Sequence, residues 1–419
     1  MIEARNLSNG ATVLFERVTA TSTVSVGFWY PYGSRDEKKG QYGFSHFLEH
    51  MLFKGTNKRN AYEIAQEIDR VGGMINAFTE KEVTCFYCTI PKNSVKTAID
   101  VLSDMIVNSR LDKKEITREM PVVLNEIRSI EDSPDEKAHE LYLKLMWGKH
   151  HLANRITGEE EDVRAITYTN LTNYYKTRYH PANLIISIAG NINIDDVYTY
   201  LESIFGNLKA DKYITEREKP EDRVFADQIK SKFDQVHIYT GTGYTASPEL
   251  EEYYDMVVFS TLMGESISSR LFQALREEQG LCYSVYSFRT YFSDTAQWTV
   301  YASTAPSDLK KLLNSLKTEI EKVRENKPEI GEIEDAKTHL LGGITIAKED
   351  METRMKRLAR QYILRGRIFN FKESVDNIKK VNKRRIDHLI NKIIAERKFN
   401  LLVYGKGRTG IKSNEEYFT

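Results

Sequence analysis

The chain has 419 residues, with 60 Lys and Arg against 60 Asp and Glu, so its formal net charge is zero, and 41% of its residues are hydrophobic. This balance argues against a nucleic-acid binder that relies on overall charge, and the apolar share is enough for two or three packed domains. Three Cys cannot form a disulfide framework. The N-terminus lacks the apolar core of a secretory signal, and no stretch has the roughly 18 apolar residues of a membrane span. We therefore expect a soluble, cytoplasmic protein with no nucleic-acid or membrane partner.

The first half of the chain predicts strands and helices in alternation. Strands are expected at 11–17, 23–30, 76–90 and 184–189, and helices at 44–53, 61–71, 94–109, 112–147 and 195–205. Residues 209–222 are charged and lack any periodicity, which is typical of a linker. After this stretch the same order recurs, with strands expected at 236–241 and 283–302 and helices at 255–263 and 269–278.

This recurrence indicates an internal repeat. TIPKNSVKTAIDVLSDMI in the first half matches STAPSDLKKLLNSLKTEI in the second half in its order of strand end, Pro and helix. We predict an α+β fold of two homologous domains, each a mostly antiparallel sheet with helices. The expected ranges are 1–210 for the first domain, 211–228 for the linker region and 229–419 for the second domain. Two unrelated α+β domains with chance similarity are the alternative.

The pentapeptide His46-Phe-Leu-Glu-His50 carries the strongest chemical signal. Positions i and i+4 of a helix lie on one face, so His46 and His50 can reach one metal ion through ring nitrogens. Glu49 lies on nearly the same face and can approach a metal-bound water without ligating the ion. H-x-x-E-H is the inverted form of the zinc-peptidase motif. A pair of surface or core histidines without a metal is the plainer alternative.

A third ligand must come from elsewhere, and Glu126 is the candidate. Glu119 and Glu126 are seven residues apart in ITREMPVVLNEIRSIED, so they lie on one helix face, two turns apart. Two carboxylates directed at one site suit a ligand and a carboxylate that supports it. This pair strengthens the metal-site interpretation over that of an ordinary histidine pair.

These motifs together resemble those of the pitrilysin/insulysin zinc peptidases, in the branch of single chains similar to the mitochondrial processing peptidase. The resemblance covers nearly the whole chain and includes GFSHFLEHMLFKGT, NAFTEKEVTCFY, VVLNEI and SRLFQALREEQGLCYSV. It implies one Zn²⁺ per chain bound by His46, His50 and Glu126, with Glu49 as the general base and Glu119 supporting the site. It also implies that the two domains form a clamshell around a substrate chamber.

The resemblance further implies roles for residues outside the metal motif. Relatives carry an Arg and a Tyr at the spacing of Arg276 and Tyr283, where the two side chains contact the substrate and the developing oxyanion. Asn76 and Ala77 begin a strand that relatives expose as a sheet edge, to which the peptide adds as an extra strand. Without the resemblance, Arg276 would be interpreted as a solvated helix residue and Tyr283 as part of a strand core.

Three local features qualify this interpretation. Pro121 falls between the two helical glutamates and is expected to bend the helix, which affects Glu119 more than Glu126. Asn125 replaces an acid common in relatives and is expected to face solvent. Cys85 and Cys88 have the spacing of redox and zinc sites, but residues three apart on a strand point to opposite faces, so we expect two core thiols.

We predict a zinc metalloendopeptidase that cleaves unfolded peptides or presequence-like segments and that assembles as a homodimer. Glu49 is expected to activate the zinc-bound water for attack on the peptide bond. The alternative is a non-catalytic partner or scaffold subunit of the same fold, and a third hypothesis is a chaperone-like peptide-binding module. The chaperone-like module predicts peptide binding without cleavage products, and the scaffold subunit also predicts no cleavage products.

Overall fold

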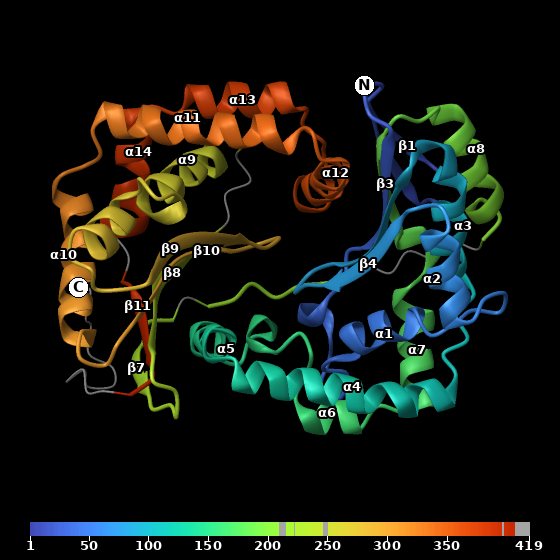
Figure 1. The fold of residues 1–419 in the computed structure, drawn as a ribbon, viewed down its shortest axis with the longest axis horizontal. Helices are drawn as coiled ribbons and strands as arrows, with labels where there is room; N and C mark the ends of the chain where they lie inside the picture. Colours follow the sequence, from blue (N-terminus) through green and yellow to red (C-terminus); the bar gives the residue numbers. More distant parts are fainter. Residues whose placement is uncertain (209–214, 222, 246–249, 396–397, 407–419) are drawn as a thin grey trace. The chain divides into compact units, whose positions relative to one another are not determined.

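A computed structural model of the chain describes residues 1–208, 215–221, 223–245, 250–395 and 398–406. Its contacts divide the chain into two compact units (Figure 1). Unit 1 contains Met1–Ser129, Asn154–Glu218 and Ile346–Asn370, and unit 2 contains Ile130–Ala153, Lys219–Thr345 and Phe371–Thr419. Of the predicted linker, 209–214 and 222 lie outside the described residues.

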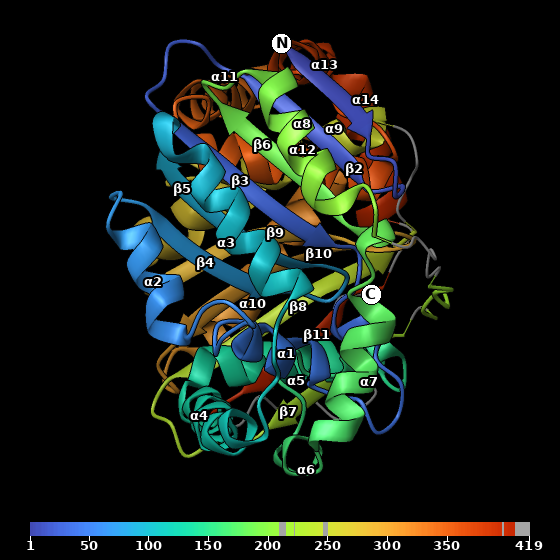
Figure 2. The ribbon, with the colours of Figure 1, turned by 90° about the vertical axis from the view of Figure 1, so that its right-hand side faces the viewer.

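Unit 1 is built on a six-stranded sheet in the order β1-β2-β6-β3-β5-β4 (Figure 2). Its strands are β1 (Ile2–Asn6), β2 (Thr12–Arg17), β3 (Thr23–Tyr30), β4 (Met74–Thr79), β5 (Thr84–Pro91) and β6 (Ile185–Gly190). Only the β2–β6 pair is parallel among these strands, so the sheet is mostly antiparallel as predicted. The strand β4 lies at one edge of the sheet, paired with β5 alone.

Helices cover both faces of this sheet. On one face lie α1 (Phe44–Leu52), α2 (Ala61–Asp69), α3 (Val95–Val107), α4 (Lys113–Asp132), α6 (Glu160–Arg164), α7 (Tyr168–Arg178) and α8 (Ile194–Phe205). On the other face α12 (Met351–Arg365) packs Met355 and Leu358 against Trp29. Because both faces are covered, β3 is buried along nearly its whole length and does not alternate between apolar and polar residues.

Unit 2 repeats this plan with a five-stranded sheet in the order β7-β11-β8-β10-β9. Its strands are β7 (Ala226–Ile229), β8 (Val236–Tyr244), β9 (Ser284–Tyr291), β10 (Ala296–Thr304) and β11 (Asn400–Tyr404). One face packs against α9 (Leu250–Ser260), α10 (Leu309–Glu325), α11 (Ile330–Ala347), α13 (Phe371–Lys380) and α14 (Lys383–Ile390). The other face packs against α5 (Pro134–Trp147). The α+β class with two similar sheet-and-helix domains is therefore confirmed.

The two units differ from the contiguous ranges 1–210 and 229–419 because each contains one helix from the other half of the chain. The helix α5 belongs to unit 2, where Tyr142 is buried beside Tyr239, and α12 belongs to unit 1. Each exchanged helix buries one face of the sheet formed by the other half of the chain. Hydrophobic periodicity shows that a helix has an apolar face, but it does not show which sheet that face covers.

Several predicted elements have different bounds in the structure. The stretch 76–90 is a hairpin of β4 and β5, because the charged run Glu80-Lys81-Glu82 forms the turn between them. The predicted helix 255–263 is α9 from Leu250 to Ser260, followed by a wider helical turn over Thr261–Glu265. Among the described residues, no helix is long and apolar enough to cross a membrane.

Candidate metal centre

The centre is built on the start of α1, which Glu37 holds in place. Its buried carboxylate accepts hydrogen bonds from the backbone N–H groups of Gly43 at 2.8 Å and Ser45 at 2.6 Å. These donors belong to the first turn of the helix, where backbone N–H groups have no partner within the helix. Gly43 has φ +81°, and a Cβ there would lie 2.4 Å from the Thr157 carbonyl oxygen, so only glycine fits. Burial raises the pKa of Glu37 to about 8.

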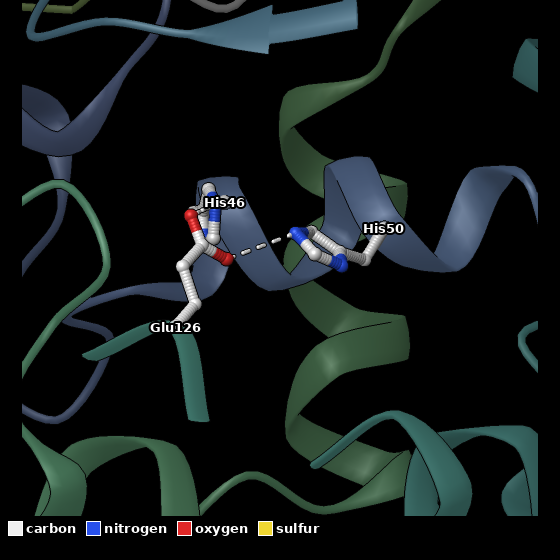
Figure 3. A group of neighbouring side chains, drawn as sticks. All are labelled: His46, His50 and Glu126. Carbon is white, nitrogen blue, oxygen red and sulfur yellow. Dashed lines mark ion pairs between the residues drawn. The ribbon is translucent and has the colours of Figure 1, made fainter. Parts of the chain in front are cut away.

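The helix α1 directs both histidines at one carboxylate. His46 Nε2 lies 3.3 Å from Glu126 Oε1, and His50 Nε2 lies 3.5 Å from Glu126 Oε2. Figure 3 shows the two imidazoles on α1 with the Glu126 carboxylate, from α4, between them. The three donor atoms lie within 4.8 Å of one another, and this is the only such group of three or more His, Cys, Asp or Glu in the described part of the chain.

Glu119 supports the centre from one side. Its Oε1 lies 2.9 Å from His50 Nδ1, and its Oε2 forms an ion pair with Lys54 Nζ at 2.6 Å. When Nδ1 carries the proton toward Glu119, His50 Nε2 keeps its lone pair for a metal. The two carboxylates from α4 thus contact the two different nitrogens of the His50 ring. Pro121 lies between Glu119 and Glu126, but α4 continues through it without a break.

The donor set fits zinc. Two imidazole nitrogens and one carboxylate are a common set of three protein ligands in catalytic zinc sites, which keep a fourth position open. In the protein without a metal, hydrogen bonds from His46 and His50 lower the pKa of Glu126 well below its ordinary value. An ionised carboxylate is the form that a metal requires, and a metal would take the place of the Nε2 protons. The outer nitrogen of His46, Nδ1, is buried and has no hydrogen-bond partner among the described residues.

Glu49 lies on α1 between the two histidines but is held by a different partner. The Thr79 hydroxyl, at the end of β4, donates a hydrogen bond to Glu49 Oε2. Burial raises the pKa of Glu49, although this hydrogen bond partly opposes the shift. A carboxylate with a raised pKa next to a metal site is suited to taking up a proton and later returning it.

The predicted substrate strand is β4. Asn76 is exposed and Ala77 is half-buried in the middle of β4, which is an edge strand of the unit 1 sheet. The free edge of β4 leads to Thr79, whose hydroxyl contacts Glu49. The expected edge position of Asn76 and Ala77 is therefore confirmed, whereas peptide binding there stays a prediction.

Arg276 and Tyr283 lie together in unit 2. The Arg276 guanidinium is 5.1 Å from the centre of the Tyr283 ring and 4.7 Å from that of Phe272. Tyr283 is 76% exposed rather than part of a strand core, and the neighbouring Cys282 is buried. The phenol is exposed and the guanidinium is half-buried, and their role toward substrate stays a prediction.

Several smaller expectations are confirmed. Cys85 and Cys88 are both free and buried, and they face different clusters on opposite sides of β5. Asn125 is exposed. Sequence reasoning missed Glu37, Lys54 and Thr79, because a hydrogen bond to a helix start or to a second carboxylate leaves no spacing signal in the chain.

Replacing Glu119 with Gln should weaken zinc binding by about 10–100-fold, because the change removes the anion that orients His50 and pairs with Lys54. Competition with a metal chelator measures this affinity. Glu115→Gln on the same helix, which breaks an ion pair with Arg118 and no other in the described part of the chain, is the matched control. Equal zinc affinities for Glu119→Gln and the control would contradict the supporting role of Glu119.

Replacing Glu37 with Gln should lower the free energy of unfolding by about 1–3 kcal/mol near pH 5, because the amide nitrogen cannot accept a backbone N–H. In the folded protein the pKa of Glu37 is about 8, above its ordinary value of 4.5. The folded state is therefore stabilised by the protonated form of Glu37, fully below pH 4.5, and this stabilisation is lost as the pH rises through 8. The difference between wild type and variant should therefore shrink over this range. Denaturant unfolding of the metal-free protein measures it, and a constant difference would contradict the assignment.

Two family models match the chain. The model described as insulinase, peptidase family M16, matches residues 12–160, which include every residue of the metal centre. The model described as the peptidase M16 inactive domain matches residues 165–340. The metal centre thus lies in the first of the two matched regions, in agreement with its position in unit 1.

Relatives and solved structures agree with these matches. The chain is 34% identical over 397 residues to the uncharacterized zinc protease YmxG of Bacillus subtilis, across 94% of this chain and 96% of the relative. It is 32% identical over 400 residues to an uncharacterized zinc protease of Mycobacterium leprae, across 93% and 89% of the two chains. The fold is similar to that of a protease from Helicobacter pylori, with a TM-score of 0.90, 19% identity and coverage of 96% of this chain and 99% of that chain. The chain belongs to the insulinase family of peptidases, peptidase family M16.

Proposed function

We propose that the protein is a zinc-dependent endopeptidase that cleaves unfolded peptides or presequence-like segments, with one Zn²⁺ held by His46, His50 and Glu126. The observation that carries the proposal is the convergence of both Nε2 atoms on Glu126, with Glu49 beside them on the same helix turn. Two relatives are named as zinc proteases, which supports the same chemistry.

Zinc held by these three residues would act as a Lewis acid, the role in which a catalytic metal lowers the pKa of water from 15.7 to about 7. Glu49 takes a proton from the attacking water and returns it to the leaving amine. The Thr79 hydroxyl holds Oε2, so we expect Oε1 to carry the proton. The raised pKa of Glu49, caused by its burial, favours the protonated form that must act as the acid in the second step.

The sheet edge selects for extended peptides. A peptide that pairs with the free edge of β4 satisfies the unpaired backbone groups of the strand and runs toward Thr79 and Glu49. Main-chain pairing demands little of the peptide sequence but requires an extended backbone, which a folded protein does not offer. We propose that Arg276 and Tyr283 also contact the substrate, a role supported by the family resemblance and by the exposure of Tyr283.

A digest of unstructured peptides of graded length, followed by mass spectrometry, tests this function. Internal cleavage that stops with a chelator and returns with added zinc is the expected result, and sedimentation of the same sample tests the proposed homodimer. Intact peptides in the presence of protein that holds one zinc per chain would overturn the proposal. That outcome would favour a non-catalytic scaffold subunit of the same fold.

A further inference from the structure

Part of the charged stretch that joins the two halves of the sequence is docked on unit 1. Arg217 forms a two-pronged ion pair with Asp36, with Nε 2.8 Å from Oδ1 and Nη2 2.8 Å from Oδ2. The Asp36 side chain is 0% exposed and that of Arg217 is 15% exposed. An arginine in a solvated linker would not be expected to form an ion pair with a buried carboxylate.

The same guanidinium connects two loops of unit 1. Arg217 Nη2 donates to the main-chain oxygens of Pro31 at 3.0 Å and Glu82 at 3.3 Å. The buried carboxylate of Glu82 also pairs with Arg35 at 2.6 Å, and Arg35 donates to the main-chain oxygen of Glu218. Arg217 and its neighbour Glu218 thus join the segment before α1 to the turn between β4 and β5.

Each of these loops holds one part of the metal centre. Asp36 directly precedes Glu37, whose carboxylate binds the first N–H groups of α1, the helix that carries His46 and Glu49. Glu82 lies in the turn that follows Thr79, the residue whose hydroxyl orients Glu49. The Arg217 hydrogen bonds in this series are 2.8–3.3 Å long, and its ion pair with Glu82 Oε1 is 3.5 Å. All the residues involved belong to unit 1.

We propose that Arg217 is a positioning residue of the metal centre, which acts through Asp36 and Glu37 on the start of α1 and through Glu82 on the turn after β4. The inference rests on the proposed function for its catalytic consequence. Its consequence for zinc affinity depends only on the ligand geometry. A planar guanidinium is required because it binds both Asp36 oxygens and two carbonyl oxygens at once, which a lysine ammonium cannot do.

The experiment compares Arg217→Met, Arg217→Lys and a control, Arg354→Met, in the full chain. Arg354 matches Arg217 well: its side chain is 14% exposed and pairs with a buried carboxylate, Glu16, in unit 1. The hydrogen bonds of Arg354 to Lys348 and Glu16 do not involve the loops that hold α1. Zinc affinity is measured by chelator competition, and kcat and KM are measured on a peptide identified in the digest.

Arg217→Met is expected to weaken zinc binding and to lower kcat by about tenfold each, within the range of changes to groups that orient metal ligands, with KM nearly unchanged. Arg217→Lys should recover part of both losses, and Arg354→Met should leave both values within about twofold of wild type. If Arg217→Met does not fold, Arg217→Lys decides alone, with an expected loss of several-fold in zinc affinity.

Two outcomes would overturn the inference: wild-type zinc affinity and kcat in the folded Arg217 variants, or equal losses in Arg217→Met and Arg354→Met, which would indicate general destabilisation. A failure of the proposed function is distinguishable from these. In that case the wild-type protein itself would bind zinc without cleaving peptides, while the affinities of the variants would still report on Arg217.

Discussion

Glu49→Gln is expected to lower kcat for an unstructured peptide by about 10²–10⁴-fold, the usual contribution of a positioned general base. Gln has nearly the same shape as Glu but cannot take a proton from water. Glu49 is not one of the three grouped metal ligands, so the zinc content of the variant should stay at one ion per chain. Single-turnover cleavage together with metal analysis of the same sample measures both quantities.

A milder variant tests how Glu49 is oriented, separately from its ability to take up a proton. Thr79→Val keeps Glu49 and the shape of the side chain but removes the hydroxyl that binds Oε2. We expect a loss of less than about tenfold in kcat, since one hydrogen bond contributes about 1 kcal/mol. The proposed mechanism is wrong if Glu49→Gln cleaves at the wild-type rate with zinc in place.

Glu126→Gln is expected to remove both zinc binding and cleavage. Glu126 is the only carboxylate in the group of three, and it faces both histidines at 3.3 and 3.5 Å. Glu126 is itself a proposed zinc ligand, whereas Glu119 only orients a ligand. The loss of zinc affinity should therefore exceed the roughly 10–100-fold that is typical when a residue orienting a ligand is replaced. Chelator competition and metal analysis after dialysis measure this loss.

The matched control for this variant is Glu115→Gln, which makes the same chemical change on the same helix. Among the described residues, Glu115 pairs with Arg118 alone. High zinc concentration should restore part of the cleavage by Glu126→Gln, because both histidines remain. Full zinc affinity in Glu126→Gln would show that the third ligand is another residue and would remove the central observation behind the proposed function.

Much of the metal centre was predictable from local periodicity. A helix repeats every 3.6 residues, so the spacing of His46 and His50 by itself implies one face. The same argument places Glu119 and Glu126 on one face of their helix. The structure adds that the two carboxylates bind opposite nitrogens of His50, which no spacing within either helix implies.

Most strands were predictable in position but not in pairing, and the short strands β1, β7 and β11 lie outside the predicted strand ranges. The charged turn within 76–90 divides that stretch into β4 and β5, and the place of β4 at the sheet edge follows from which strands pair with it. The identity of an edge strand depends on hydrogen bonds to distant segments. The edge position of Asn76 and Ala77 was therefore predictable only through the family resemblance.

The sequence by itself determined the repeat, the α+β class and the residues that can bind zinc, because these follow from short-range periodicity and from the chemistry of side chains a few positions apart. Only the tertiary structure decided that α5 and α12 are exchanged between the two units and that Arg217 docks on Asp36. Both depend on contacts between segments far apart in the chain. An apolar helix face or an arginine fits many surfaces, and only the packed fold selects one of them.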